Sequence, residues 1–183
     1  MARRRTESLL VSQYVDGVVR RRPDEVIVEE PMTIELDGVR VTTTMRTPGN
    51  DFELAVGFLH GEGLLGNAPV REVKYCANGS AVESGFNIVT VSTDGSGPAP
   101  KARLAATTSS CGLCGNEAID ELVARLEPID PTRVARFDLA LLAELPRRAE
   151  GYQPLFGATG GVHAAVAVRT DGSPVVARED VGR

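Results

Sequence analysis

Two cysteines separated by two residues, Cys111 and Cys114, are the residues of this chain best suited to chemistry. They lie in the polar segment Thr107–Gly115, in which Gly112 and Gly115 directly follow the cysteines. Because glycine has no side chain, the backbone there can approach a bulky partner closely. An apolar pattern of helical spacing begins next and stops at a proline; it consists of Ala118, Ile119, Leu122, Val123 and Leu126. The cysteines are therefore predicted to lie at a helix N-terminus, where exposed N–H groups favour the thiolate.

The spacing of the two cysteines leaves four interpretations open. A redox disulfide pair lacks the apolar strand and the aromatic residue that usually precede a thioredoxin-type motif. Half of a zinc site needs two more ligands, and the candidates Cys76, His60 and His163 show no paired spacing. A purely structural role is a poor match to glycine-flanked cysteines at a helix start. A sulfur relay, in which a thiolate accepts persulfide sulfur and passes it on, requires little beyond accessible cysteines of low pKa.

A second candidate segment runs from Thr159 through Gly160 and Gly161 to His163. The glycine pair frees backbone N–H groups that can bind an anionic ligand, although two glycines alone do not define a phosphate loop. His163 is either a strand histidine with a backbone partner or a polar group that faces the cysteine site. Of the remaining candidates, Cys76 is expected to be a small buried residue within a strand and His60 to cap a helix C-terminus.

Several elements must position these residues. Asp37-Gly38 between two alternating runs predicts a hairpin, because a type I′ turn needs positive φ at both central positions. Asn50 is predicted to cap a helix over Phe52–His60, with Glu53 as its capping-box partner. Asp138 is predicted to cap a helix that Pro146 ends or kinks. Further strands are predicted over 26–30, 70–76, 86–92, 162–168 and 174–178.

These elements suggest a division of the chain into three parts. Residues 1–23 are polar and basic and are expected to form a loose arm, with a strand near Tyr14–Val19. Residues 24–100 are expected to form a small α+β domain that ends in a Gly- and Pro-rich linker over 94–100. Residues 101–183 carry the cysteine loop and are expected to form a second domain, in which two helices are followed by two strands.

Composition restricts the function classes. Hydrophobic residues make up 42% of the 183 residues, and the net charge is −5, which argues against nucleic acid as a partner. The basic start of the chain is not followed by an apolar signal-peptide core, and no apolar run is long enough to cross a membrane. The chain is therefore expected to be cytoplasmic, where three cysteines do not form a disulfide scaffold.

Taken together, the motifs resemble the FdhD family of formate dehydrogenase accessory sulfurtransferases. The resemblance spans most of the chain in family order. The residues that carry it are Glu30-Pro31, Met45-Arg46-Thr47-Pro48, Asp51, Gly57-Phe58, Glu62-Gly63, Ser109-Ser110-Cys111-Gly112-Leu113-Cys114-Gly115, Gln153, Phe156, Thr159-Gly160-Gly161-Val162-His163 and Arg178-Glu179-Asp180-Val181-Gly182-Arg183.

The resemblance implies a fold and an activity. The fold would be an α/β class with a cytidine deaminase-like domain behind a smaller α+β N-terminal domain. The activity would be that of a sulfurtransferase with a cysteine persulfide intermediate: a cysteine desulfurase loads sulfur, which passes to the molybdenum bis-guanine-dinucleotide cofactor before its insertion into formate dehydrogenase. Cys111 would carry the persulfide and Cys114 would assist. A non-catalytic cofactor-binding chaperone and a Cys-x-x-Cys redox protein are the alternatives.

The resemblance also implies ligands and partners. Thr159, Gly160, Gly161 and His163 would lie near the cofactor, which is a bound substrate and for which a guanine nucleotide would be a mimic. No tightly bound metal is expected, nor binding to nucleic acid or to a membrane. The chain is expected to form a homodimer. Family members continue beyond the Arg-Glu-Asp-Val-Gly-Arg motif, so the second domain is expected to be C-terminally incomplete here. Deaminase activity is not expected, because Ala164-Ala165 follow His163 where a zinc deaminase needs His-x-Glu.

Overall fold

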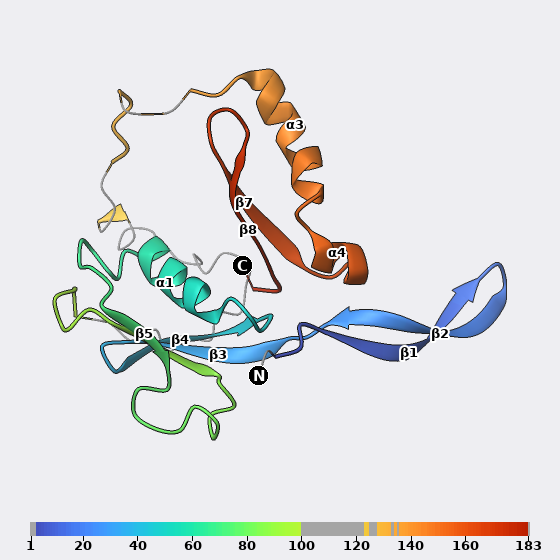
Figure 1. Cartoon of the computed structure of the whole chain (residues 1–183), viewed down its shortest axis with the longest axis horizontal. Helices are drawn as coiled ribbons and strands as arrows, with labels where there is room; N and C mark the ends of the chain where they lie inside the picture. Colours follow the sequence, from blue (N-terminus) through green and yellow to red (C-terminus); the bar gives the residue numbers. More distant parts are fainter. Residues whose placement is uncertain (1–2, 100–122, 125–127, 133, 135, 183) are drawn as a thin grey trace. The chain divides into compact units, whose positions relative to one another are not determined.

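The structure is a computed structural model that describes residues 3–99, 123–124, 128–132, 134 and 136–182 (Figure 1). Strands and helices both occur, which confirms a mixed α and β composition. The loop with Cys111 and Cys114 lies outside the described residues, as does most of the helix predicted after it. The cytidine deaminase-like arrangement of the second domain stays a prediction.

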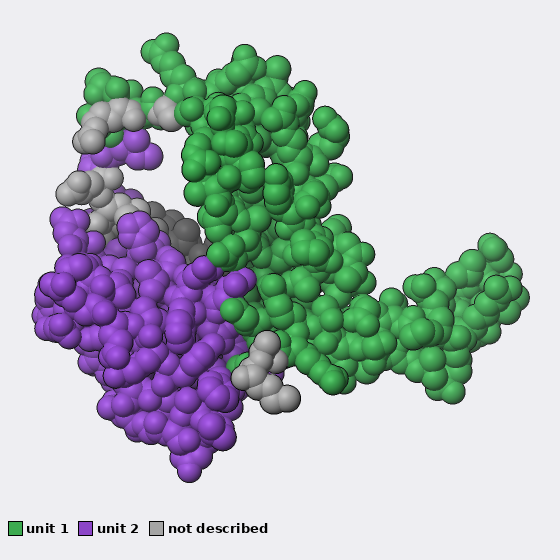
Figure 2. Space-filling view, viewed as in Figure 1, with its two compact units in different colours: residues 1–29, 47–49, 130–182 green, residues 30–46, 50–129, 183 purple. Residues whose placement is uncertain are grey.

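The chain divides into two compact units, which Figure 2 shows in different colours. The first unit consists of residues 1–29, 47–49 and 130–182, and the second contains residues 30–46 and 50–129. Each unit is therefore assembled from segments that are separate in sequence. The domain boundaries proposed from the sequence at 23/24 and 100/101 stay a prediction.

The second unit is built on a four-stranded sheet in the order β4-β3-β6-β5. Its strands are β3 (Glu30–Leu36), β4 (Val39–Arg46), β5 (Glu72–Tyr75) and β6 (Ile88–Ser92). The predicted hairpin between β3 and β4 is confirmed, with Asp37 at φ 48° and Gly38 at φ 81°. The parallel pairing of β3 with β6 places β6 beside this hairpin.

The core of the second unit lies between this sheet and helix α1 (Asp51–Gly61). Alternate residues of the strands face α1, as period-two alternation requires. The fully buried apolar side chains are Met32, Ile34, Leu36, Val41, Ala55, Leu59, Val89 and Val91. The predicted helix is thus confirmed, but its predicted cap is wrong: the Asn50 side chain makes no capping hydrogen bond. Asp51, the next residue, instead binds a buried arginine.

The first unit contains a two-stranded antiparallel ribbon of β1 (Thr6–Val15) and β2 (Val18–Ile27). Asp16 and Gly17 form its turn, with φ values of 51° and 80°. The strand predicted over Tyr14–Val19 is therefore wrong, because that range crosses the turn. The segment predicted as a loose arm is a regular hairpin from residue 6 onward.

The rest of the first unit is formed by two helices and a second hairpin. These elements are α3 (Leu139–Glu150), α4 (Pro154–Thr159), β7 (His163–Val168) and β8 (Pro174–Asp180). Asp138 caps α3 as predicted, since its Oδ1 accepts the N–H groups of Ala140 and Leu141 at 2.7 and 3.2 Å. Of the two predicted effects of Pro146, an end of the helix is excluded, because α3 continues to Glu150, and a kink stays a prediction. No α3 side chain is buried, so water can satisfy the carbonyl that loses its helical partner at the proline.

Gly172, in the turn between β7 and β8, is predicted to be a stability-determining residue. Its φ is +80°, and a Cβ atom there would lie 2.5 Å from Leu141 Cδ1. Gly172→Ala should therefore lower the free energy of unfolding by about 1–2 kcal/mol for the left-handed backbone, with a smaller further loss because the partly exposed Leu141 side chain must move away from the new methyl group. Gly17→Ala is the matched control, because Gly17 has the same φ with nothing within 4 Å. Equal losses in chemical denaturation would contradict the steric part of the prediction.

Candidate functional site

Glu179 of β8 connects the C-terminal hairpin to the start of α4. Its carboxylate is buried and accepts two backbone N–H groups, from Leu155 at 2.9 Å and from Phe156 at 2.7 Å. These are orphan donors of the first helical turn, so Glu179 acts as a cap supplied from a distant strand. Arg5 donates to the Glu179 carbonyl at 2.9 Å, which joins the base of the ribbon to the same strand.

The next residue, Asp180, forms a hydrogen bond with the backbone of a segment that is distant in the sequence. The Thr47 N–H donates to Asp180 Oδ2 at 3.2 Å, and Thr47 Oγ1 accepts the Val181 N–H at 3.2 Å. Asp180 Oδ1 also accepts the Gly182 N–H at 2.7 Å. We refer to Thr47, Thr159, Gly160, Gly161, His163, Glu179 and Asp180 as the α4/β8 cluster. Its members come from three motifs that lie in separate parts of the sequence.

The Thr159-Gly160-Gly161 segment forms the end of α4. Gly160 has a left-handed φ of 66°, and its N–H donates to Phe156 O at 2.7 Å, which is the usual glycine C-cap. Thr159 Oγ1 donates to Leu155 O at 2.8 Å and accepts the Gly161 N–H at 3.3 Å. The Gly160 and Gly161 N–H groups, which were predicted to bind an anion, therefore donate to hydrogen bonds within the turn. The cofactor-binding role of these residues stays a prediction.

His163 is the first residue of β7 and is exposed. The antiparallel register places it directly opposite Asp180, so an imidazole and a carboxylate occupy neighbouring positions of one hairpin face. Such a pair can bind a ligand that offers both hydrogen-bond donors and acceptors. The structure thus brings His163 together with Asp180 and the end of α4, while its position relative to Cys111 and Cys114 is not described.

The other sequence candidates lie outside this cluster. Cys76 follows β5 with φ 53° and is half-buried, so the expectation of a buried strand residue is wrong. His60 lies in the last turn of α1, where a cation complements the helix dipole. Among the described residues, no group of three or more His, Cys, Asp or Glu side chains is placed to hold a metal ion.

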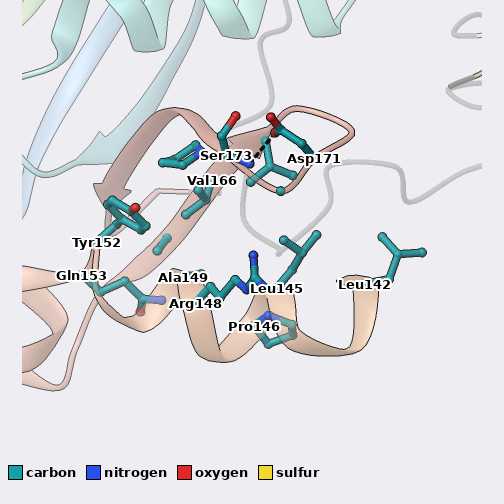
Figure 3. A pocket seen from close by; sticks show the side chains of 14 residues that line it. Leu142, Leu145, Pro146, Arg148, Ala149, Tyr152, Gln153, Val166, Asp171 and Ser173 are labelled. Carbon is teal, nitrogen blue, oxygen red and sulfur yellow. Dashed lines mark hydrogen bonds between the residues drawn. The ribbon is translucent and has the colours of Figure 1, made fainter. Parts of the chain in front are cut away.

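A groove of about 760 Å³ lies in the first unit between α3 and the β7–β8 hairpin (Figure 3). Figure 3 shows Leu145, Pro146 and Arg148 on the helical side, with Val166 on the strand. Hydrogen bonds from Ser173 hold the pKa of Asp171, at one end of the groove, below its ordinary value, so this carboxylate is ionised at neutral pH. The volume is that of a small-molecule site, with an apolar lining and few polar groups.

Arg46 is the centre of a buried polar network in the second unit. Its Nε and one terminal nitrogen bind both oxygens of Asp51 at 3.1 Å, and its other terminal nitrogen binds Glu30 at 3.0 Å. Asn87 accepts a further hydrogen bond at 2.9 Å, and Tyr75 donates to Asp51 at 3.1 Å. The network joins the start of β3, the end of β4 and the start of α1. Sequence reasoning did not predict these contacts, although an Arg and an Asp five residues apart across a Pro-Gly turn are a usable signal.

Comparisons with known proteins give a consistent result. The model of the FdhD/NarQ family matches residues 27–183. The chain is 43% identical to the sulfur carrier protein FdhD of Streptomyces avermitilis and 40% identical to that of Mycolicibacterium paratuberculosis, over 97% and 100% of its residues. It spans 65% of the Streptomyces protein and 67% of the Mycolicibacterium protein.

A solved structure supports the fold. A crystal structure of a protein from Desulfotalea psychrophila, provisionally described as a formate dehydrogenase accessory protein, matches with a TM-score of 0.66. The match covers 98% of this chain and 64% of that protein at 23% identity, so it is a likeness of fold. In the described part of the chain, no helix has the length and hydropathy that crossing a bilayer requires.

Proposed function

Because this chain belongs to the FdhD/NarQ family, we propose that it is a sulfur carrier in the maturation of formate dehydrogenase. In this proposal a cysteine desulfurase supplies persulfide sulfur to Cys111. The molybdenum bis-guanine-dinucleotide cofactor is the substrate that receives the sulfur before it enters formate dehydrogenase. The observation that carries the proposal is the 43% identity to a protein named as a sulfur carrier, over a range that includes the Cys-Gly-Leu-Cys-Gly loop.

Loading is a thiol exchange without net oxidation. The Cys111 thiolate attacks the outer sulfur of the donor persulfide and forms a new S–S bond. The S–S bond of the donor breaks, and its cysteine leaves as a thiolate. The helix that the sequence predicts after the loop would favour this step, because a helix N-terminus stabilises the attacking thiolate.

Release requires two electrons, which Cys114 can supply. The Cys114 thiolate attacks Sγ of Cys111, a Cys111–Cys114 disulfide forms, and the outer sulfur leaves as sulfide toward the cofactor. The two cysteine sulfurs together lose the two electrons that reduce the transferred sulfur to sulfide. A cellular thiol reductant then restores the dithiol. The separation of two residues between the cysteines is the spacing that such an exchange needs.

We assign the cofactor contact to the α4/β8 cluster. His163 is exposed opposite Asp180, so its imidazole can bind an anionic or nucleobase group of the cofactor. Glu179 is used internally to cap α4, which makes it a positioning residue for the turn at Gly160 and Gly161. The groove beside α3 supports the alternative of a cofactor-binding chaperone without sulfur transfer, because its volume suits a small molecule.

Replacing His163 is expected to weaken nucleotide binding without unfolding the chain. His163→Ala removes a ring donor from an exposed strand position, so the dissociation constant for GDP should rise about tenfold, as for a lost hydrogen bond to a charged group, while the chain stays folded. His60→Ala is the control, because that histidine lies on α1 in the other unit. Unchanged titration calorimetry for His163→Ala would return the residue to a structural role.

Cyanolysable sulfur separates the function classes. The purified chain is incubated with a cysteine desulfurase and free cysteine, desalted and treated with cyanide, which releases persulfide sulfur as thiocyanate. A sulfur carrier gives thiocyanate in proportion to protein. A cofactor-binding chaperone gives none but still binds GDP. A redox protein gives none and instead exchanges its disulfide with a thiol reductant.

A further inference from the structure

The turn that follows β5 presents an asparagine–glycine pair on the surface of the second unit. Asn78, Gly79 and Ser80 are all exposed, and they lie in the segment that connects β5 to β6. The residue before them is held in place, because the Ala77 N–H donates to Thr90 Oγ1 at 3.3 Å. The Gly79 N–H and the Asn78 amide, by contrast, form no hydrogen bond with any described residue. Both groups are therefore accessible to water and free to react.

This pair combines a carbonyl carbon with a nitrogen that can attack it. Asparagine is among the thermolabile residue types, because the backbone nitrogen of the next residue can close a five-membered ring onto Cγ of the side chain. Ring closure brings the backbone of the next residue close to the asparagine side chain. A glycine at that position has no Cβ atom in the way and adopts the required backbone conformation readily. Asn78 is followed by such a glycine.

Two other asparagines of the same unit lack these conditions. Asn67 is also exposed, but the nitrogen that would attack it belongs to Ala68, which has a Cβ atom and whose N–H donates to Leu65 O at 3.0 Å. The side chain of Asn87 is fixed, because its Oδ1 accepts a hydrogen bond from Arg46 at 2.9 Å. The structure therefore distinguishes Asn78 from both of them by exposure, by the free nitrogen or by the following residue.

We propose that Asn78 is a site of spontaneous deamidation, in which the chain modifies itself without an enzyme or a cofactor. Gly79 N gives its proton to a base in the solvent, such as hydroxide, and attacks Asn78 Cγ. The Cγ–Nδ2 bond breaks, Nδ2 takes up a proton and leaves as ammonia, and a succinimide ring remains. Water then opens the ring at Cγ to give aspartate, or at the main-chain carbonyl to give isoaspartate. No electrons are transferred, since the net reaction consumes water and releases ammonia.

The reaction adds a negative charge to a polar pocket of the second unit. This pocket has a volume of about 280 Å³, and its lining includes Asn78, Asp37, Glu72 and Lys74. A Cβ atom at Gly38 would lie 3.9 Å from Asn78 Nδ2, so the amide lies beside the β3–β4 turn. One lysine accompanies two carboxylates in this lining before the reaction and three after it. The modified chain is therefore more acidic. The inference does not depend on sulfur transfer, so it can fail or hold separately from the proposed function.

The first test compares asparagines within one sample of the purified chain. The chain is kept in mildly alkaline buffer and digested at intervals at acidic pH, and the replacement of –NH₂ by –OH is followed by peptide mass. Asn78 is expected to react about tenfold faster than Asn67 or more, because the reaction at Asn67 must break the Ala68 hydrogen bond and accommodate a Cβ atom. Equal rates at the two asparagines overturn the proposal.

The same comparison in urea separates the contribution of the fold from that of the sequence. Unfolding removes the hydrogen bond from Ala68 to Leu65, so the rate at Asn67 should rise, whereas the rate at Asn78 should stay within about twofold of its value in the folded chain. A large rise at Asn78 would show that the folded turn protects this residue, which overturns the accessibility on which the proposal rests.

Gly79→Ala tests the role of the glycine. Gly79 does not have a left-handed φ, and a Cβ atom there would lie 3.3 Å from Cys76 Sγ, which a small movement of the thiol relieves. The rate at Asn78 should fall about tenfold. Ser80→Ala is the matched control, because it keeps the Asn78-Gly79 pair and removes only an exposed hydrogen bond with Glu83, so its rate should stay within about twofold of the original. An unchanged rate in Gly79→Ala overturns the proposal.

The products test the mechanism in the original chain, without any variant. Direct hydrolysis of the side-chain amide gives aspartate alone, whereas the succinimide gives isoaspartate as well. A protein isoaspartate methyltransferase transfers a methyl group from S-adenosylmethionine to isoaspartate and not to aspartate. Methylation of the peptide that contains position 78 is therefore expected after incubation and not before it. Deamidation at this position without any methylation would exclude the ring-closing step and overturn the proposal.

Discussion

Replacing Cys111 by alanine is expected to reduce sulfur loading from one atom per chain to none. Cys111 is the proposed attacking thiolate, so its removal takes away the sulfur atom that forms the new S–S bond. The measurement is intact-protein mass after incubation with a cysteine desulfurase and free cysteine. Cys76→Ala is the matched control, because Cys76 lies after β5, outside the cysteine loop, and its removal should leave loading complete.

Cys114→Ala tests the division of roles in the loop. This variant should still gain sulfur but fail to activate formate dehydrogenase, because the thiolate that expels sulfide is missing. Full loading and activation by Cys111→Ala would show that the assignment is wrong. Loading that moves to Cys114 in Cys111→Ala would make the two cysteines equivalent, whereas no loading of the original chain would contradict the sulfur-carrier function itself.

Replacing Arg46 by alanine is expected to have the largest effect on stability. Arg46 is fully buried and binds both oxygens of Asp51 together with Glu30 and Asn87. Removal of one partner of a buried ion pair costs about 3–5 kcal/mol, since the remaining charge loses its counter-charge in a low dielectric. For a chain of this size the melting temperature should fall by about 10 °C, which calorimetry can measure.

A second arginine–carboxylate pair is the control for this prediction. Arg148 binds Glu144 one turn earlier in α3, and both side chains are 47% exposed. Water and salt screen such a pair, so Arg148→Ala should leave the melting temperature unchanged within error. Similar losses for the two variants would mean that the network around Arg46 contributes no more than a surface pair.

Local signals predicted the second unit better than the first. Asp37-Gly38 lies between strictly alternating runs, and the hairpin followed from turn chemistry and alternation together. Asp16-Gly17 is the same dipeptide, but Arg20–Arg22 interrupt the alternation on one side, so its turn was missed. Because the ribbon exposes both of its faces, its strands need no alternation of apolar and polar residues. Their sequence pattern is therefore a weak predictor of strands.

The candidate site depended on contacts that a single sequence does not reveal. Asp138 caps α3 two residues away, a distance over which side-chain chemistry is predictable. Glu179 caps α4 from 23 and 24 residues away, which only the hairpin register determines. Asn50, by contrast, had the right type for a cap, but its backbone does not adopt the extended conformation that a cap needs.

The bond between Thr47 and Asp180 has a consequence for synthesis of the chain on the ribosome. The two residues are 133 positions apart, and closing such a loop costs about 2 kcal/mol more chain entropy than closing a ten-residue loop. The ribbon can form within about 10 μs of its emergence, whereas Thr47 waits on the order of 10 s for Asp180 to be translated. The α4/β8 cluster is thus completed late, and a nascent chain cannot hold this part of the site.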